Sequence, residues 1–231
     1  ARDGVITVVG EIDKQVITTS VFANFGNGLT QNVKRYYREG VLWVINGEQD
    51  ITNSLYDIHG QVGRSEIVSY GYNPTKTFSD VQIINYLEYD NFGNAIRQTV
   101  DTYTHLTMRT SEYLQDHKYI LNEYQNDVQR RKGNPWKSTV ERFNDVSGTV
   151  KLDKTITITT SYDTNGNALN QTVDRSVWQS TVYVLESKKT ITNSGFDNRG
   201  NALTQEVKSW RVDGVVETFV DCVRNSNRKF D

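Results

Sequence analysis

Cysteine, proline and histidine are scarce in this chain of 231 residues, and long apolar runs are missing. With Cys222 as its single cysteine, the chain cannot form an internal disulfide or a metal site based on thiolates. No apolar run approaches the roughly 18 residues that a membrane span needs. The net charge of −2 gives no reason to expect nucleic acid or an anionic membrane as a partner.

The residues that are abundant are polar or favour strands. Hydrophobic residues make up 36% of the chain, which is low, whereas 13 tyrosines accompany many threonines and valines. Aromatic and β-branched residues are enriched in strands. We therefore expect an all-β protein with a thin core made of Tyr, Thr and Val side chains.

A sequence repeat runs along the whole chain, and a glycine followed by Asn or Gln marks each unit. Both Gly and Asn tolerate positive φ angles, so this pair is typical of a tight turn. The six predicted turn glycines are Gly26, Gly60, Gly93, Gly133, Gly166 and Gly200. The step from one of these glycines to the next is nearly constant, with one longer step between Gly93 and Gly133.

The residues on either side of these turns follow strand patterns. An aromatic residue and Asp precede several turns, as in Tyr89-Asp90, and side chains alternate with a period of two after them. A second turn recurs at Glu39-Gly40 and Asp213-Gly214. Each repeat is therefore predicted to be two strands, and the chain an antiparallel meander of about a dozen strands. The meander could form a solenoid, an extended ribbon or a shell.

No linker interrupts the pattern, so residues 1–231 are predicted to be a single array of about six units. The array starts just after a strand, at residues 1–5, and its last residues, Phe230-Asp231, fall in the column before a turn. Terminal repeats normally need caps. We therefore interpret the chain as a window of a longer array.

The fourth repeat is irregular, because the step from Gly93 to Gly133 is longer than every other step between turn glycines. Within residues 111–132, Leu114, His117 and Leu121 are three and four positions apart, which suits a helix as well as a strand. A strand is favoured over a helix because the neighbouring repeats would impose strand pairing.

No catalytic or cofactor-binding arrangement is present among the motifs, so the chain is predicted not to be an enzyme. His59, His105 and His117 are scattered and are interpreted as surface residues rather than metal ligands. Alternating oxygen ligands at Asp163, Asn165 and Asn167 suit calcium, but turn chemistry is favoured over a metal site.

An aromatic residue occupies the tenth position after the glycine in five of six repeats. These rings either pack along the array, which is favoured, or stack on sugars. The candidate glycan-stacking residues are Tyr36, Tyr37, Tyr70, Tyr103 and Trp210. The basic run Arg130-Arg131-Lys132 is interpreted as a solvated turn, because the chain as a whole is acidic.

The recurring pattern, as in Tyr89-Asp90-Asn91-Phe92-Gly93-Asn94, resembles that of the YD-repeat or Rhs-like family. This resemblance implies a large secreted or surface-exposed protein whose strands wind into long antiparallel sheets, without catalytic residues. The period of this chain is longer than the family's usual repeat, which favours a wider ribbon, fibre or solenoid.

From this we expect a structural repeat segment of a large extracellular or cell-surface protein, acting as a filament, coat or stalk. Its expected partners are further strands of the same kind, joined through sheet edges or lateral contacts. Two alternatives are an adhesin or glycan-binding array and an Rhs-type toxin shell.

Overall fold

The computed structural model describes residues 13–23, 26–197 and 200–226, and it is almost entirely β-structure. The ends of the predicted array, at residues 1–5 and Phe230–Asp231, lie outside the described residues. Within the described residues, thirteen strands form one open antiparallel meander in which each strand pairs with its neighbours in sequence. The predicted all-β meander is thus confirmed.

The strands differ in length but keep their order. They are β1 (Asp13–Phe22), β2 (Gly28–Glu39), β3 (Leu42–Ser54), β4 (Arg64–Tyr72), β5 (Lys76–Tyr89), β6 (Ala95–Tyr103), β7 (Leu114–Glu123), β8 (Lys137–Phe143), β9 (Lys151–Tyr162), β10 (Ala168–Gln179), β11 (Val182–Phe196), β12 (Ala202–Asp213) and β13 (Val216–Ser226). A 3-10 turn, η1 (Ser111–Tyr113), precedes β7, and a short helix, α1 (Asp127–Lys132), joins β7 to β8.

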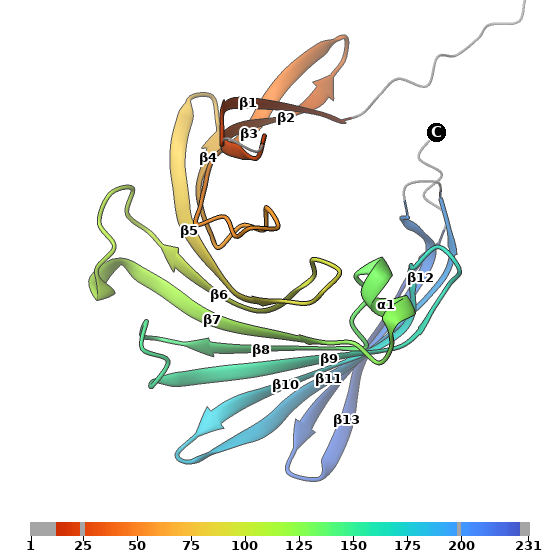
Figure 1. The fold of residues 1–231 in the computed structure, drawn as a ribbon. Coiled ribbons are helices and arrows are strands. Elements are labelled where there is room, and N and C mark those ends of the chain that lie inside the picture. The colour runs from red at the N-terminus through yellow and green to blue at the C-terminus, as the bar shows by residue number, and fades with distance from the viewer. Residues whose placement is uncertain (1–12, 24–25, 198–199, 227–231) are drawn as a thin grey trace, which may run out of the picture. The chain divides into compact units, whose positions relative to one another are not determined.

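The chain divides into two compact units, the first holding the described residues up to Val81 and the second those from Gln82 onward. In the second unit, strands β6 to β13 lie side by side in chain order, and α1 lies at the end of the strands where β7 connects to β8 (Figure 1).

The core of each unit is thin, because a single sheet covers few side chains. In the first unit Val33 and Val81 are the buried apolar side chains among the described residues. The second unit buries a larger set, which consists of Ile83, Val100, Tyr103, Phe143 and Val212. Most other side chains are half-buried, so the sheet depends on cross-strand pairs for much of its stability.

Many of these pairs join β-branched residues of the predicted repeat. Val33 lies opposite Ile17, and Ile67 lies opposite Ile51. In the second unit, Val207 stands between Ile191 and Val223 on the neighbouring strands. Each of these three residues therefore has a β-branched partner on the strand that precedes it, because the period of two and the turn length fix the register. On the following strand the partner can be polar, as Gln49 is for Val33.

The connections between strands lie alternately at the two ends of the strands and differ in length. At the end away from the repeat glycines, two-residue turns link β2 to β3, β10 to β11 and β12 to β13. Their first residues, Gly40, Ser180 and Gly214, have φ angles of 60°, 56° and 62°. A positive φ at this position matches the twist of the flanking strands. The predicted second turns at Gly40 and Gly214 are thus confirmed.

Residues 111–132 combine both of the structures considered for them. Residues 114–123 form β7, as favoured, and pair with β6 and β8. The end of the segment is a helix and not a strand, which corrects the prediction for 127–132. Asn126 caps its start by accepting a hydrogen bond from the amide of Gln129. Gly133 ends it with a φ of 66°, so this glycine is a helix cap and not a hairpin residue.

Candidate functional site

The repeat turns share one geometry, which Asp163 illustrates. The amide of Gly166 donates to the carbonyl of Asp163, and the amide of Asp163 donates to the carbonyl of Asn167. This pattern is a type I turn followed by a glycine with positive φ, here 95°. The same pair of backbone bonds occurs in the turns that begin at Ala23, Asp57, Asp90 and Asp197.

The Asp carboxylate holds the turn from inside. Asp163 Oδ1 accepts hydrogen bonds from the amides of Asn165 and Asn167, at 2.9 and 2.8 Å, and its Oδ2 accepts one from the side chain of Asn167. These bonds, led by that from the Asn167 side chain, lower the pKa of Asp163 below its usual value and outweigh the opposing effect of desolvation.

The three candidate calcium ligands are therefore all close together, but nitrogen donors already surround the carboxylate of Asp163. Among the described residues, no group of three or more His, Cys, Asp or Glu side chains is placed to hold a metal ion. The turn interpretation of Asp163, Asn165 and Asn167 accounts for the observed hydrogen bonds without a cation.

Four of the turns also contact the next one along the array through the asparagine that follows the turn glycine. The side chain of Asn134 donates to the carbonyl of Gly166 at 3.1 Å, and that of Asn94 donates to the carbonyl of Arg130, close to Gly133, at 2.6 Å. In the first unit the Asn27 side chain lies against Gly60. We call this row of contacts the turn ladder, defined by the pairs Asn27–Gly60, Asn94–Gly133, Asn134–Gly166 and Asn167–Gly200.

A second set of bonds ties four of the turns to the following repeat. The carbonyl two residues after the turn glycine accepts a hydrogen bond from an Asn side chain, as Asn53 gives to Gly28, Asn122 to Ala95 and Asn193 to Ala168. Tyrosine hydroxyls make the same kind of bond, from Tyr56 to Gly28 and from Tyr162 to Pro135. The tyrosine before the turn is therefore a hydrogen-bond donor, a role that the sequence pattern alone did not indicate.

The candidate glycan-stacking rings have separate partners. Tyr70 packs under the Lys76 ammonium, 3.9 Å from the ring centre, and against Phe78. Trp210 meets Phe219 edge to face at 6.0 Å. Tyr103 is only 4% exposed and faces the Arg109 guanidinium.

The two remaining candidates lie on β2. The Lys14 ammonium is 5.9 Å from the ring centre of Tyr36, and Tyr37 is exposed. Packing within each unit occupies the rings of Tyr70, Tyr103 and Trp210.

The histidines also have separate surroundings. His59 lies in a turn, where its amide donates to Asp57. His105 packs against Tyr113 with ring centres 4.7 Å apart, and its Nδ1 accepts hydrogen bonds from two backbone amides of the same loop. His117 is buried and pairs with Asp101 at 2.5 Å, so it is not the surface residue that was expected.

The basic run also differs from the expected solvated turn, because Arg130, Arg131 and Lys132 form the last turn of α1. Lys132 reaches the neighbouring turn and donates to the carbonyl of Thr164 at 2.7 Å. Arg131 lies over the ring of Phe92. The helix therefore bridges the turns on both sides of it.

Charged residues form a ladder across β7 to β11 in the second unit. Asp153 is 3% exposed and is held by Arg142, with Nε at 2.8 Å, and by Arg175 at 3.0 Å. Hydrogen bonds, foremost that from Arg142, lower the pKa of Asp153. Arg142 also faces Asp116, and Arg175 also pairs with Glu186. Charges of alternating sign on adjacent strands thus compensate the buried carboxylate.

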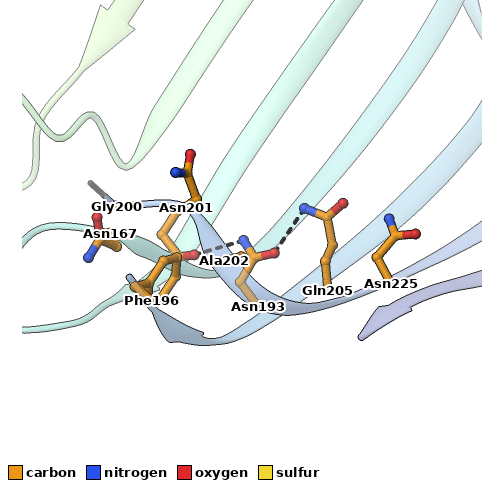
Figure 2. Close-up of a pocket in the computed structure, with 9 residues that line it drawn as sticks. Asn167, Asn193, Phe196, Gly200, Asn201, Ala202, Gln205 and Asn225 are labelled. Atoms are coloured by element: carbon orange, nitrogen blue, oxygen red, sulfur yellow. Dashed lines mark hydrogen bonds between the residues drawn. The ribbon is translucent and has the colours of Figure 1, made fainter. Parts of the chain in front are cut away.

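The cavity with the most distinctive lining lies beside the Gly200 turn, on β11, β12 and β13 and the start of β10. Its volume is about 450 Å³, and uncharged residues line it, namely Asn167, Ala168, Asn193, Phe196, Gly200, Asn201, Ala202, Gln205 and Asn225. Figure 2 shows the side chains of Asn193, Gln205 and Asn225 in a row on one face of neighbouring strands. We call this site the amide pocket.

The sequence pattern contained part of the signal for this pocket. The glutamine column after the turn, which includes Gln171 and Gln205, is visible in the repeat. However, Asn193 and Asn225 lie on other strands, and only the register places them beside Gln205.

A second cavity of about 480 Å³ lies between the Asp90 turn and α1, and it has a charged lining that includes Glu88, Asp127 and Arg130.

Comparison with protein-family models, curated proteins and solved structures gives no match for this chain. Within the described ranges, no helix is long and apolar enough to cross a membrane. The strand topology by itself defines the class of the protein, which is an all-β repeat protein with an open antiparallel meander.

Proposed function

We propose that the chain is a structural repeat segment of a large extracellular or cell-surface protein, where it serves as a filament, coat or stalk. The observation that carries this proposal is the turn ladder, in which one repeat contacts the next through the same Asn–Gly pair. Where each repeat stabilises its neighbour in this way, an array can be lengthened by adding units.

The outermost strands support a scaffold that associates through its edges. Every residue of β13 is exposed, including Phe219, Val220 and Val223, and no strand within the described ranges pairs with its outer side. By the repeat pattern β13 corresponds to β11, which pairs with a strand on each side. A free edge of this kind is a template for a further strand.

A duplication tests the scaffold role. Residues 167–200 span one repeat, and a second copy placed directly after Gly200 restores the Gly-Asn junction. We expect the longer protein to fold, to gain strand signal in circular dichroism in proportion to its length, and to unfold at the same temperature or higher. A lower unfolding temperature or loss of strand signal would count against an extendable array.

The location is tested on intact source cells by protease treatment and immunoblotting. The proposal expects cleavage of this protein under conditions that leave a cytoplasmic marker whole. Full protection until the cells are lysed would overturn the cell-surface assignment. Negative-stain electron microscopy of the native protein then distinguishes a filament or stalk from a coat.

A further inference from the structure

The amide pocket is a preorganised polar surface. Asn193 donates to the carbonyl of Ala168 at 2.9 Å and accepts from Gln205 Nε2 at 3.0 Å, so both ends of its amide are fixed. Asn201 is held by its hydrogen bond to Asp197. Side chains that are already oriented lose less conformational entropy when they bind a ligand.

Several polar groups of the pocket remain available to a ligand. Gln205 uses its amide nitrogen for Asn193, which leaves its carbonyl oxygen as an acceptor. The side chain of Asn225 is exposed and makes no hydrogen bond to another described residue, so it offers two donors and an acceptor. Phe196 adds an apolar ring to the same lining.

The combination of uncharged amides and one aromatic ring determines which class of ligand fits the pocket. A charged ligand would find no opposite charge in the lining, because no charged residue belongs to it. An apolar ligand would leave the amides without partners, which costs free energy. A neutral molecule with several hydroxyl groups satisfies both conditions, since each hydroxyl both donates and accepts a hydrogen bond.

We propose that the amide pocket binds a neutral saccharide, with hydroxyl groups on Gln205 and Asn225 and one sugar face against Phe196. Its volume of about 450 Å³ falls within the usual range for small-molecule sites. This site differs from the aromatic column that the sequence indicated, because amides on three strands and not stacked rings form it. The proposal is independent of the scaffold role.

The other repeats lack the same row of amides. Asn53 faces Ser65 in place of a glutamine, and Gln171 faces Thr159 in place of an asparagine. We therefore expect the strands β11 to β13 to hold the saccharide site, and the equivalent position at Gln171 to serve as an internal control.

Binding is measured by titrating the whole protein with neutral oligosaccharides of glucose, galactose, mannose and N-acetylglucosamine, using calorimetry and NMR. We expect at least one of them to bind with a dissociation constant on the order of 1 mM or lower. Gln205→Ala and Asn225→Ala should each weaken binding by about tenfold or more, which corresponds to about 1.4 kcal/mol. Gln171→Ala should leave binding unchanged.

Circular dichroism of each variant separates loss of the site from loss of the fold, and Asn225→Ala is the safer variant because Asn225 is exposed. The proposal is overturned if no neutral oligosaccharide binds, or if the Gln205 and Asn225 variants bind as the unaltered protein does. A preference for sialylated or sulfated sugars would also overturn it, since the pocket has no cation to receive them.

Discussion

Asn167 and Gly200 belong to successive turns, and Asn167 Oδ1 lies 3.0 Å from the place that a Cβ on residue 200 would occupy. Asn167 cannot swing away freely, because its amide nitrogen is bonded to Asp163 Oδ2 at 2.9 Å. Glycine at position 200 is thus required for two reasons, its positive φ angle and the neighbouring turn.

Gly26 allows these two reasons to be tested separately. It has nearly the same φ as Gly200, 81° against 82°, but no atom of the described residues lies within 4 Å of its Cβ position. We expect Gly26→Ala to cost about 1 kcal/mol through backbone strain alone. Gly200→Ala should cost about 1 kcal/mol more, because the Asn167–Asp163 bond is lost. Urea unfolding followed by circular dichroism measures both. In a protein that also carries Asn167→Ala, Gly200→Ala should lower the free energy of unfolding by no more than Gly26→Ala does. Equal losses of stability for Gly26→Ala and Gly200→Ala in the otherwise unaltered protein would argue against the turn ladder.

Glu48 is expected to make the first unit sensitive to acid. It is 7% exposed and accepts hydrogen bonds from Tyr72 at 2.5 Å and Asn32 at 2.7 Å, with Lys76 at 3.1 Å. Burial alone would raise the pKa of Glu48, but these hydrogen bonds outweigh burial and hold the pKa at about 2. The hydrogen bond to Glu48 in turn raises the pKa of Tyr72 to about 12.

Since the pKa of Glu48 is lower in the folded state than its ordinary value of 4.5, its contribution to stability is complete above pH 4.5. That contribution should be lost as the pH falls from 4.5 towards 2. Thermal unfolding across this range should show a steep decline in the unaltered protein and a shallower one in Glu48→Gln. The exposed Glu217→Gln serves as the control, and parallel profiles for all three proteins would contradict the assignment.

The stability that the charged ladder contributes is expected to depend far more on Asp153, at its centre, than on Glu186, at its end. Asp153→Asn removes the buried charge shared by Arg142 and Arg175, and breaking such a pair costs about 3 kcal/mol. Glu186→Gln removes a half-exposed partner of Arg175, for which a loss of at most about 1 kcal/mol is expected. Chemical unfolding in low and in high salt measures both effects. Similar losses in the two variants would show that burial does not set the strength of the ladder.

The meander could be predicted from the sequence because its two signals are local. Alternation with a period of two specifies the strands, and Gly-Asn pairs such as Gly166-Asn167 specify the turns. The Asp163 carboxylate accepts its hydrogen bonds from amides of its own turn, so the signal for this contact also lies within a few residues of sequence.

The parts that depend on register or on competing signals were harder to predict. The spacing of Leu114, His117 and Leu121 suits a helix, yet pairing with β6 and β8 makes this stretch a strand. The helix that follows had its own local signals in Asn126 and Gly133, at the positions of its two caps. The amide pocket had only the glutamine column as a signal, because Asn193, Gln205 and Asn225 become neighbours only through strand pairing.

Helix α1 is expected to be an insertion into a regular repeat and not a requirement of the sheet. None of its residues is buried, and it replaces the short turn found in the other repeats. Exchanging residues 125–134 for the five-residue turn Asp-Asn-Asn-Gly-Asn should leave the strand signal in circular dichroism unchanged. The loss of the Lys132–Thr164 bond should lower the unfolding temperature by only about 2–4 °C, equivalent to about 1 kcal/mol.

The expected tolerance follows from the turn ladder, because the new turn again places a glycine beside Asn94, as Gly200 lies beside Asn167. Asn126→Ala provides the matched control, since it removes the helix cap without shortening the chain, at a cost of about 1 kcal/mol. A large drop in unfolding temperature on exchange, together with a small one for Asn126→Ala, would show that the helix supports the sheet through its contacts with the turns on either side.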